Sequence, residues 1–303
     1  MSAIAKHFPV EDNRPILEST ESFSAVVENG ESQQAVPSPS RLDHPIFSMI
    51  VPVYNEAVSF PKLIAEVEQA RLSPFQLFVV YDTPGDTTRP VAEELAATRP
   101  WLKLVHNQLG RGPANALRAG FQAAGKGPSL VVMADLSDDL SVVPDLLTLY
   151  FDGHHVVCPS RFMPGGQMLA KPGLKPVLAR TAGVLLRWFA RFPVHDATNN
   201  FRLYDAEMVN QLGIRSRFGF EVALELTARA YAAGARVTEV PSCWRDRTDG
   251  TSNFRLWKWL PHYLKWYLFA ISRQFSRIYR APRPLNPPSR LVGEVNIQRS
   301  TQI

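Results

Sequence analysis

Cysteine is scarce in this chain of 303 residues, which contains only Cys158 and Cys243. The two cysteines form no CxxC pair and no zinc-type spacing, which excludes a disulfide-stapled scaffold and a cysteine-based zinc centre. We therefore expect two buried thiols in a reducing compartment.

Long apolar runs are missing as well. No stretch approaches the roughly 20 consecutive apolar residues that a transmembrane helix needs, and the N-terminal MSAIAKHFPVEDNRP lacks the apolar centre of a secretory signal. The sequence predicts a protein that is soluble or attached to a membrane surface.

Two common nucleotide-binding fingerprints are absent. The short Gly110-Arg111-Gly112 segment has neither the spacing of a dinucleotide-binding motif nor the lysine of a P-loop. This argues against NAD chemistry and against ATP hydrolysis of the P-loop kind.

The composition is that of a folded protein, with 45% hydrophobic and 20% charged residues. The length allows one large α/β domain or two small ones with a proper core. A net charge of +5 is modest evidence for partners that carry phosphate.

Apolar, β-branched runs alternate with amphipathic stretches along most of the chain. This alternation predicts α/β architecture with a doubly wound, mostly parallel sheet. We expect strands at 47–53, 76–80, 102–106, 130–133, 155–158 and 236–240, and helices at 59–70, 88–98, 114–124, 140–151, 176–192 and 221–233.

The segment GPSLVVMADLSDD is the most informative one. Its apolar run ends in Asp135, Asp138 and Asp139, three carboxylates within five residues that repel each other unless a cation, hydrogen bonds or water offset the charge. Mg²⁺ and Mn²⁺ favour such oxygen ligands together with phosphate and water, which predicts a metal–diphosphate site. The alternative is a solvated acidic turn, with Asp138 or Asp139 capping the helix that follows.

Two other predicted strands also end in carboxylates, Glu56 and Asp82. Because the carboxyl ends of neighbouring parallel strands converge, these side chains and Asp135 predict a nucleotide crevice. Gly110 and Arg111 are placed to contact phosphate. Arg161, which follows another strand, is either a phosphate clamp or a member of a surface ion pair.

Several motifs in this order resemble the GT-A glycosyltransferases of family 2. The dolichol- or polyprenyl-phosphate mannosyltransferases are the most similar subgroup, and the resemblance runs from about Phe47 to Tyr267. The motifs are PVYNE (52–56), the Asp-ended second strand, GRGPANALRAG (110–120), VVMADLSDD (131–139), PSRF (159–162), TNNFRLY (198–204), GFE (219–221) and EVP–W–DRT–G–SNF (239–254).

The resemblance implies a GT-A fold and an inverting transfer of mannose or another hexose. The donor would be GDP-mannose or a UDP-hexose, the acceptor a polyprenyl or dolichyl phosphate, and the place the cytoplasmic face of an anionic membrane. It assigns Pro52, Tyr54, Glu56 and Asp82 to the nucleotide pocket.

The resemblance also implies a divalent metal, Mg²⁺ or Mn²⁺, bound by Asp135. Met133 stands where the family has its first metal-motif aspartate, and Ser137 where it has a further ligand. Asp138 or Asp139 would compensate, and Asp138 is taken with Asp135 as the metal pair. Near the donor or acceptor phosphates the resemblance places Ser160, Arg161, Lys175, Arg180, Arg247 and Ser252.

Two alternative functions remain open on the sequence. A transferase that acts on a glycan or other hydroxyl needs a carboxylate base, for which Glu221 is the first candidate and Glu225, one turn further on, the second. Glu221 is otherwise expected to pair with an arginine. The second alternative is a non-catalytic, membrane-bound nucleotide-sugar-binding or scaffold protein. It stays open because Met133 replaces the first aspartate of the metal motif.

The stretch 254–280 predicts an amphipathic helix at a membrane interface, with Pro261 kinking or restarting it. The alternative is a helix that packs on the sheet or a second subunit. An apolar face beside the basic one does not resemble a base-stacking platform, so nucleic acid is not expected. The predicted basic arc is Arg255, Lys258, His262, Lys265, Arg273, Arg277 and Arg280, and the apolar arc is Trp257, Leu260, Leu264, Leu268, Ile271 and Phe275.

The remaining segments frame a single catalytic domain. Residues 1–44 are polar and without periodicity, which predicts a disordered extension, and the Pro-rich 281–303 predicts a disordered tail. The domain division is therefore 1–44, 45–253, 254–280 and 281–303.

Overall fold

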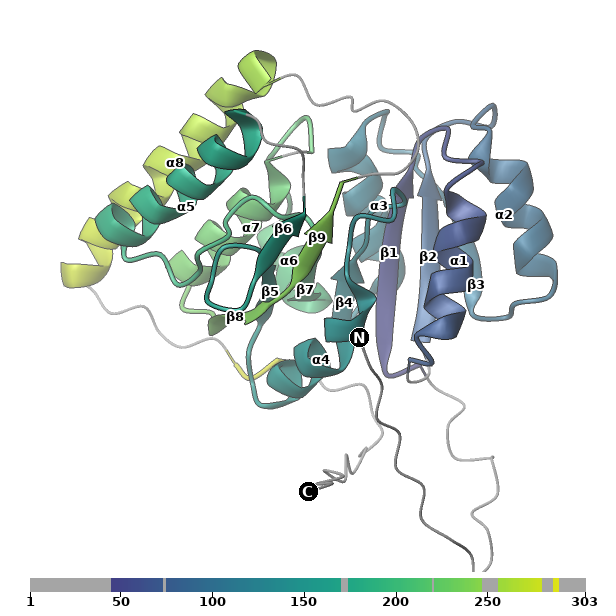
Figure 1. The fold of residues 1–303 in the computed structure, drawn as a ribbon, viewed down its shortest axis with the longest axis horizontal. Coiled ribbons are helices and arrows are strands. Elements are labelled where there is room, and N and C mark those ends of the chain that lie inside the picture. The colour runs from purple at the N-terminus through teal and green to yellow at the C-terminus, as the bar shows by residue number, and fades with distance from the viewer. Residues whose placement is uncertain are drawn as a thin grey trace, which may run out of the picture. The chain divides into compact units, whose positions relative to one another are not determined.

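A mixed sheet flanked by helices forms the centre of the fold in the computed structural model (Figure 1). The structure describes residues 45–72, 75–169, 174–219, 221–246, 256–279 and 286–288. Its first half contains β1 (Phe47–Val53), α1 (Phe60–Gln69), β2 (Phe75–Tyr81), α2 (Thr88–Ala97), β3 (Leu102–His106), α3 (Pro113–Ala124) and β4 (Pro128–Val131).

The second half is less regular. It contains the 3₁₀ helix η2 (Leu140–Val142), α4 (Val143–Phe151), β5 (Val156–Ser160), β6 (Gln167–Leu169), α5 (Leu174–Ala190), β7 (Arg202–Asp205), α6 (Ala206–Leu212), α7 (Val222–Ala232), β8 (Val237–Pro241), β9 (Cys243–Arg245) and α8 (Leu256–Tyr279).

The main sheet has seven strands in the order β3-β2-β1-β4-β7-β5-β8. β1 pairs in parallel with β2 and β4, β2 with β3, and β5 with β8, whereas β7 is antiparallel to both neighbours. β6 and β9 form a second, two-stranded sheet. The predicted doubly wound, mostly parallel α/β architecture is confirmed.

Hydrophobic side chains cover both faces of the main sheet, as a parallel sheet requires. Along β1, Met49 and Val51 belong to the cluster shared with α1 and α4, while Ile50 belongs to the cluster shared with α3, α6 and α7. This alternation follows from the two-residue period of a strand.

Several elements differ from the sequence expectation, including β6, β9 and α6, which were not predicted. The strand before the acidic segment ends at Val131, so Met133 and Asp135 lie in the loop that follows it. The helix expected at 140–151 begins as η2 and becomes α-helical at Val143, with Pro144 in its first turn. β7 was not predicted as a strand, because four residues give too little periodicity.

The segment after β9 contains one long helix, and α8 runs across Pro261 instead of restarting there. α5 and α8 lie side by side in Figure 1, and Tyr267 of α8 donates a hydrogen bond to the carbonyl of Ala182 on α5 (3.1 Å). Within the described ranges, no helix has both the length and the apolarity needed to cross a membrane.

Candidate active site

The three predicted strand-end carboxylates come from strands that are neighbours in the sheet. β1 lies between β2 and β4, so the segments that carry Glu56, Asp82 and Asp135 leave the same edge of the sheet. The β4 segment stays attached to β1 beyond its last paired residue, because the amide of Val132 donates to the carbonyl of Ile50 (3.0 Å). The topology brings these segments together as the sequence predicted.

The turn after β1 is fixed by the loop after β2. Asn55 adopts a left-handed conformation (φ +58°), and its amide donates to Asp86 Oδ1 (3.1 Å), while the amide of Glu56 donates to Thr88 Oγ1 (2.8 Å). Ser59 Oγ donates to Glu56 Oε2 (2.6 Å). Tyr54 and Asn55 are both exposed in this turn.

Asp86 is a site residue that the sequence reasoning missed. It is buried, its Oδ1 accepts from Asn55 and from the amide of Thr88 (2.8 Å), and its Oδ2 has no hydrogen-bond partner among the described residues. The signal was the aspartate of the Thr-Pro-Gly-Asp turn. Asp86 holds the β1 turn in register with the loop after β2.

Asp82 organises the Gly-Arg-Gly loop. Its Oδ2 accepts from the amide of Gly112 (2.7 Å), and its Oδ1 accepts from Asn107 Nδ2 (2.7 Å), which also donates to the carbonyl of Gly110 (2.8 Å). Gly112 has φ +117°, which strongly favours glycine. Arg111 at the tip is exposed. The structure thus joins Asp82, Gly110 and Arg111, and adds Asn107, which carried no sequence signal.

The acidic segment after β4 uses its carboxylates in different ways. Asp135 Oδ1 accepts from the amide (3.2 Å) and hydroxyl (2.6 Å) of Ser137. Asp139 caps η2 by accepting from the amide (3.1 Å) and hydroxyl (2.6 Å) of Ser141. The capping role that the sequence left open therefore belongs to Asp139.

Asp138 is turned inward. It is buried, and its Oδ2 accepts from the amide of Met133 (3.0 Å). Burial raises the pKa of Asp138 to about 8, with the negative charge of Asp135 adding to the shift, while the Met133 amide and Arg161 oppose it. A carboxyl that is held largely protonated near neutral pH is a weak ligand for a hard cation.

These contacts limit how the segment could hold a metal. No group of three or more His, Cys, Asp or Glu side chains in the described part of the chain is arranged to bind one. Asp135 fits as a single carboxylate ligand, provided that a diphosphate and water supply the other oxygens, as is common for Mg²⁺. Met133 offers no hard ligand, and Asp138 is committed to the Met133 amide.

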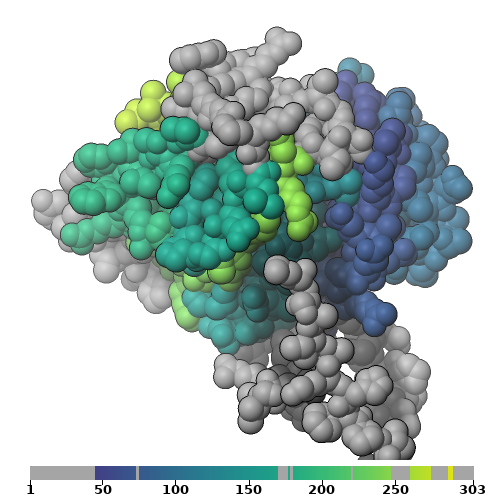
Figure 2. All heavy atoms as spheres, in the orientation of Figure 1, coloured from purple at the N-terminus to yellow at the C-terminus, as the bar shows by residue number. Residues whose placement is uncertain are grey.

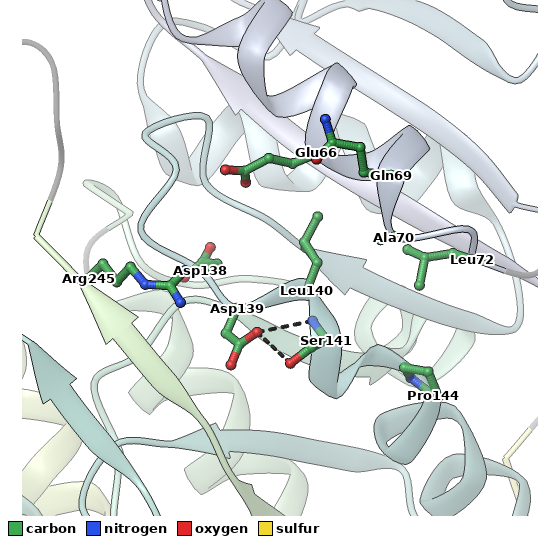
Figure 3. Close-up of a pocket in the computed structure, with 10 residues that line it drawn as sticks. All are labelled: Glu66, Gln69, Ala70, Leu72, Asp138, Asp139, Leu140, Ser141, Pro144 and Arg245. Carbon is green, nitrogen blue, oxygen red and sulfur yellow. Dashed lines mark hydrogen bonds between the residues drawn. The ribbon is translucent and has the colours of Figure 1, made fainter. Parts of the chain in front are cut away.

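A pocket of about 360 Å³ lies beside this segment (Figure 3). Asp138, Asp139, Glu66 of α1 and Arg245 of β9 contribute its charged side chains, and in Figure 3 the guanidinium of Arg245 reaches toward the loop that carries the two aspartates. The lining does not include Tyr54 or Asp82. The pocket is therefore separate from the strand-end cluster.

Arg161 is a member of a buried ion pair. Its Nε and Nη2 contact the two carboxylate oxygens of Asp196 (2.6 and 3.0 Å), and Nη2 also donates to Thr198 (3.1 Å). Burial alone would raise the pKa of Asp196, but the guanidinium more than offsets it and the pKa is lowered. The structure shows a buried ion pair instead of the surface pair that was the alternative to a phosphate clamp, and the phosphate role of Arg161 stays a prediction.

Glu221 and Glu225 differ sharply in their surroundings. Both are buried, but Glu225 accepts from the amides of Arg215 and Ser216 (2.6 Å each) and from Arg229 (2.8 Å). Glu221 forms no ion pair with a described residue, and its Oε2 has no hydrogen-bond partner among them. Glu225 is therefore held by the loop and by Arg229, whereas the described residues leave Oε2 of Glu221 without a partner.

The loop before Glu221 lies against the Gly-Arg-Gly loop. A Cβ on Gly219 would lie 2.6 Å from Cβ of Pro113 and 2.7 Å from the amide nitrogen of Ala114, so only glycine fits this contact. On the other side, burial and the charge of Glu221 raise the pKa of the Tyr263 hydroxyl on α8. The base candidate thus lies between the predicted phosphate loop and α8.

The remaining predicted residues are on α5 or outside the described residues. Arg180 is exposed on α5. Lys175 is on the same helix, but its side chain is not among those described, and Arg247 and Ser252 lie outside the described residues. Their roles stay predictions.

Comparison with known proteins identifies relatives whose names each include a polyprenyl-type lipid. The chain is 29% identical to the polyprenol monophosphomannose synthase of Mycolicibacterium smegmatis, over 67% of this chain and 79% of that protein. It is 28% identical to the undecaprenyl-phosphate mannosyltransferase of Micrococcus luteus, over 67% and 85%. Identity to the dolichol-phosphate mannosyltransferase of Pyrococcus furiosus is 24%, over 72% of this chain and 64% of that protein, less than two thirds of its length.

Solved structures confirm the GT-A fold. Glucosyl-3-phosphoglycerate synthase from Mycobacterium tuberculosis, in complex with Mn²⁺, UDP-glucose and phosphoglyceric acid, matches 80% of this chain and 90% of its own with a TM-score of 0.56 and 16% identity. The sequence profile described as glycosyl transferase family 2 matches residues 48–213, more than half of the chain. The chain belongs to glycosyl transferase family 2.

Proposed function

We propose that the protein is an inverting glycosyltransferase that moves mannose or another hexose from a nucleotide-sugar to a polyprenyl or dolichyl phosphate. The observation that carries this proposal is the naming of three relatives: two are mannosyltransferases named for dolichol phosphate and undecaprenyl phosphate, and the third is a polyprenol monophosphomannose synthase. The arrangement of Glu56, Asp82 and Asp135 along one sheet edge supports it.

The donor is proposed to bind over the ends of β1, β2 and β4. Pro52 and Tyr54 offer an apolar and aromatic surface for the base, and Glu56 and Asp82 offer carboxylate oxygens to ribose hydroxyls or base N–H groups. The Gly110–Gly112 loop and Arg111 are proposed to face the diphosphate. GDP-mannose and UDP-hexoses both fit these interactions.

The reaction separates charge, and the chain supplies compensating groups. Displacement of the nucleoside diphosphate develops positive charge on the sugar and negative charge on the leaving oxygen. A divalent metal, Mg²⁺ or Mn²⁺, held by Asp135 would supply Lewis-acid stabilisation of the leaving diphosphate. Arg161 acts through Asp196, which keeps the segment after β5 in place.

A phosphate acceptor changes what the site must do. It is already anionic, so it needs positioning more than a general base. Lys175, Arg180, Arg247 and Ser252 are proposed as its contacts, and Glu221 is then proposed to accept a hydrogen bond from a substrate hydroxyl.

The protein is proposed to work at the cytoplasmic face of a membrane, as a peripheral protein on an anionic surface. The acceptor is a lipid in this proposal, and the segment that includes α8 is rich in basic and apolar residues. The proposed division keeps residues 45–253 as the catalytic domain and 254–280 as the interfacial helix.

The test is a transfer assay on the full chain. GDP-mannose, UDP-glucose and UDP-galactose are each incubated with Mg²⁺ or Mn²⁺ and with polyprenyl phosphate or a hydroxyl acceptor, and nucleoside diphosphate release is measured. We expect release with one donor only when polyprenyl phosphate is present. Release with hydroxyl acceptors alone would replace the lipid acceptor.

Donor binding is measured independently by thermal shift on the wild type and on Asp135→Ala. A ligand that binds only the folded state raises the melting temperature by mass action. Release by no donor, combined with the absence of any shift, would overturn the nucleotide-sugar proposal.

A further inference from the structure

Helix α5 exposes an unusual number of large apolar side chains. Trp188 is 82% exposed and Phe189 65%, and Val177, Val184 and Leu185 are exposed beside them. Val177, Val184 and Trp188 follow each other at spacings of seven and four residues, so they share one side of the helix. Large exposed aromatics on a folded domain indicate a contact surface.

Helix α8 exposes a matching stripe. Leu260, Leu264 and Leu268 are each about half exposed and lie four residues apart, whereas Trp266 and Ala270 on the other side of the helix are buried. In this part of α8 the leucine side chains are therefore directed outward.

The two exposed faces adjoin. The hydrogen bond from Tyr267 to the carbonyl of Ala182 joins the helices. Tyr267 lies three residues after Leu264, and Ala182 lies three residues before Leu185, so the contact borders the exposed face on both helices. The helices lie side by side in Figure 1, and Figure 2 shows α5 at the left of the molecule, far from α2.

The charges around this surface have one sign. The sequences of α5 and α8 contain no Asp or Glu. Exposed basic side chains flank the apolar faces, and no ion pair in the described ranges involves them. They are Arg180, Arg187, Arg191, Lys265 and Arg273.

We propose that α5 and α8 together form one docking surface for an anionic lipid bilayer. We call it the α5–α8 surface, made of Val177, Val184, Leu185, Trp188, Phe189, Leu260, Leu264 and Leu268 with the five flanking basic residues. Apolar and aromatic side chains enter the interfacial region, and the basic side chains contact anionic headgroups. The inference deepens the proposed function and rests on it for the lipid acceptor.

A bilayer is favoured over a second protein by this charge pattern. A self-associating face of this kind would bring like charges together, since the surface carries basic groups and no acidic ones on its helices. Anionic headgroups offset those charges while the acyl region takes the aromatic side chains. The complementarity therefore points to lipid.

The inner side of α8 connects this surface to the candidate site. Trp266 Nε1 donates to Ser216 Oγ (3.0 Å), and the ring of His262 lies 4.4 Å from that of Phe218, so α8 supports the loop that leads to Glu221. Docking through the opposite side of the helix would hold this loop near the bilayer, where a lipid phosphate is presented.

Vesicle flotation tests the surface directly. The full chain is mixed with phosphatidylcholine vesicles that contain or lack phosphatidylglycerol. Wild type is expected to float with the anionic vesicles, and the double variant Trp188→Ser/Phe189→Ser is expected to bind about tenfold or more weakly. Val58→Ser, at an exposed apolar position in the turn between β1 and α1, is the control and is expected to bind like wild type.

Charge is tested separately. Arg187→Glu is expected to weaken binding roughly fivefold or more, because each basic group near an anionic surface contributes on the order of 1 kcal/mol. Lys103→Glu makes the same charge reversal at an exposed position of β3, which is not part of the α5–α8 surface. It is expected to have a much smaller effect.

Transfer assays separate this inference from the proposed function. In detergent with a short-chain polyprenyl phosphate, the Trp188/Phe189 variant is expected to keep wild-type activity, and to lose it only on acceptor embedded in vesicles. Two results would overturn the docking inference. One is wild type that does not bind protein-free anionic vesicles, and the other is wild type that is a dimer while the Trp188/Phe189 variant is a monomer. Vesicle binding without any sugar transfer would instead sink the proposed function alone.

Discussion

Arg161→Met is the substitution that most directly tests the reading of the site. Methionine keeps an unbranched apolar stem beside the ring of Phe162, over which the guanidinium now lies at 5.0 Å, but removes the charge from Asp196. Asp196 is fully buried. The amides of Arg161, Thr198 and Asn199 still donate to this carboxylate, and Arg202 also favours its charged form. The loss of the guanidinium is therefore expected to cost no more than the roughly 3–5 kcal/mol of a broken buried pair.

The loss of stability caused by Arg161→Met is expected to depend on pH, and the pKa of Asp196 sets the direction. The lowered pKa of Asp196 means that its ion pair contributes stability above the unfolded pKa and loses it as the pH falls through the folded value. Without Arg161 that pKa rises. The variant is therefore expected to be most destabilised near neutral pH and to approach wild type as the pH falls toward about 4, where unfolded aspartate also takes up a proton.

Urea unfolding across this pH range, monitored by fluorescence, measures the effect. Adding Asp196→Asn to Arg161→Met removes the stranded charge and is expected to recover part of the loss. Arg99→Met is the control, because Arg99 pairs with Glu68 at 2.8 Å in a much more exposed setting and should cost no more than about 1 kcal/mol. Unchanged stability with lost sugar transfer would refute the ion-pair reading and restore Arg161 as a phosphate contact.

Three further substitutions follow from the site. Asp135→Asn should lower transfer about a hundredfold or more, since it removes the anionic oxygen of the diphosphate site, whereas Asp139→Asn, which alters only the η2 cap, should retain most activity; equal losses would contradict the assignment. The raised pKa of Asp138 means that wild type, in chelator, should lose stability as the pH rises from about 4 to about 8, and Asp138→Asn should flatten that slope in chemical denaturation; an unchanged slope would disprove the shift. Gly219→Ala, at φ +107° against Pro113, should destabilise by about 1–3 kcal/mol in thermal unfolding, while Gly85→Ala, with open space around it, should not; similar melting of the two would argue against the contact.

The sequence by itself determined the α/β architecture and the edge of the sheet that carries the site. Alternating strands and helices leave a local periodicity, and carboxylates at strand ends can be read without knowing which strands pair. The doubly wound sheet and the shared sheet edge of the segments that carry Glu56, Asp82 and Asp135 followed from such local patterns and their order, whereas the GT-A fold and the family followed from the resemblance of the motifs.

Only the tertiary structure decided the partners of individual side chains. Arg161 meets Asp196 from 35 positions away, Asp82 meets the amide of Gly112 from 30 positions away, and neither pairing leaves a trace in local periodicity. The exposed faces of α5 and α8 become one surface only because the two helices pack together. The burial of one face of a helix or strand leaves a hydrophobic period in the local sequence. Ion pairs, buried acids and composite surfaces depend instead on which distant segments come into contact.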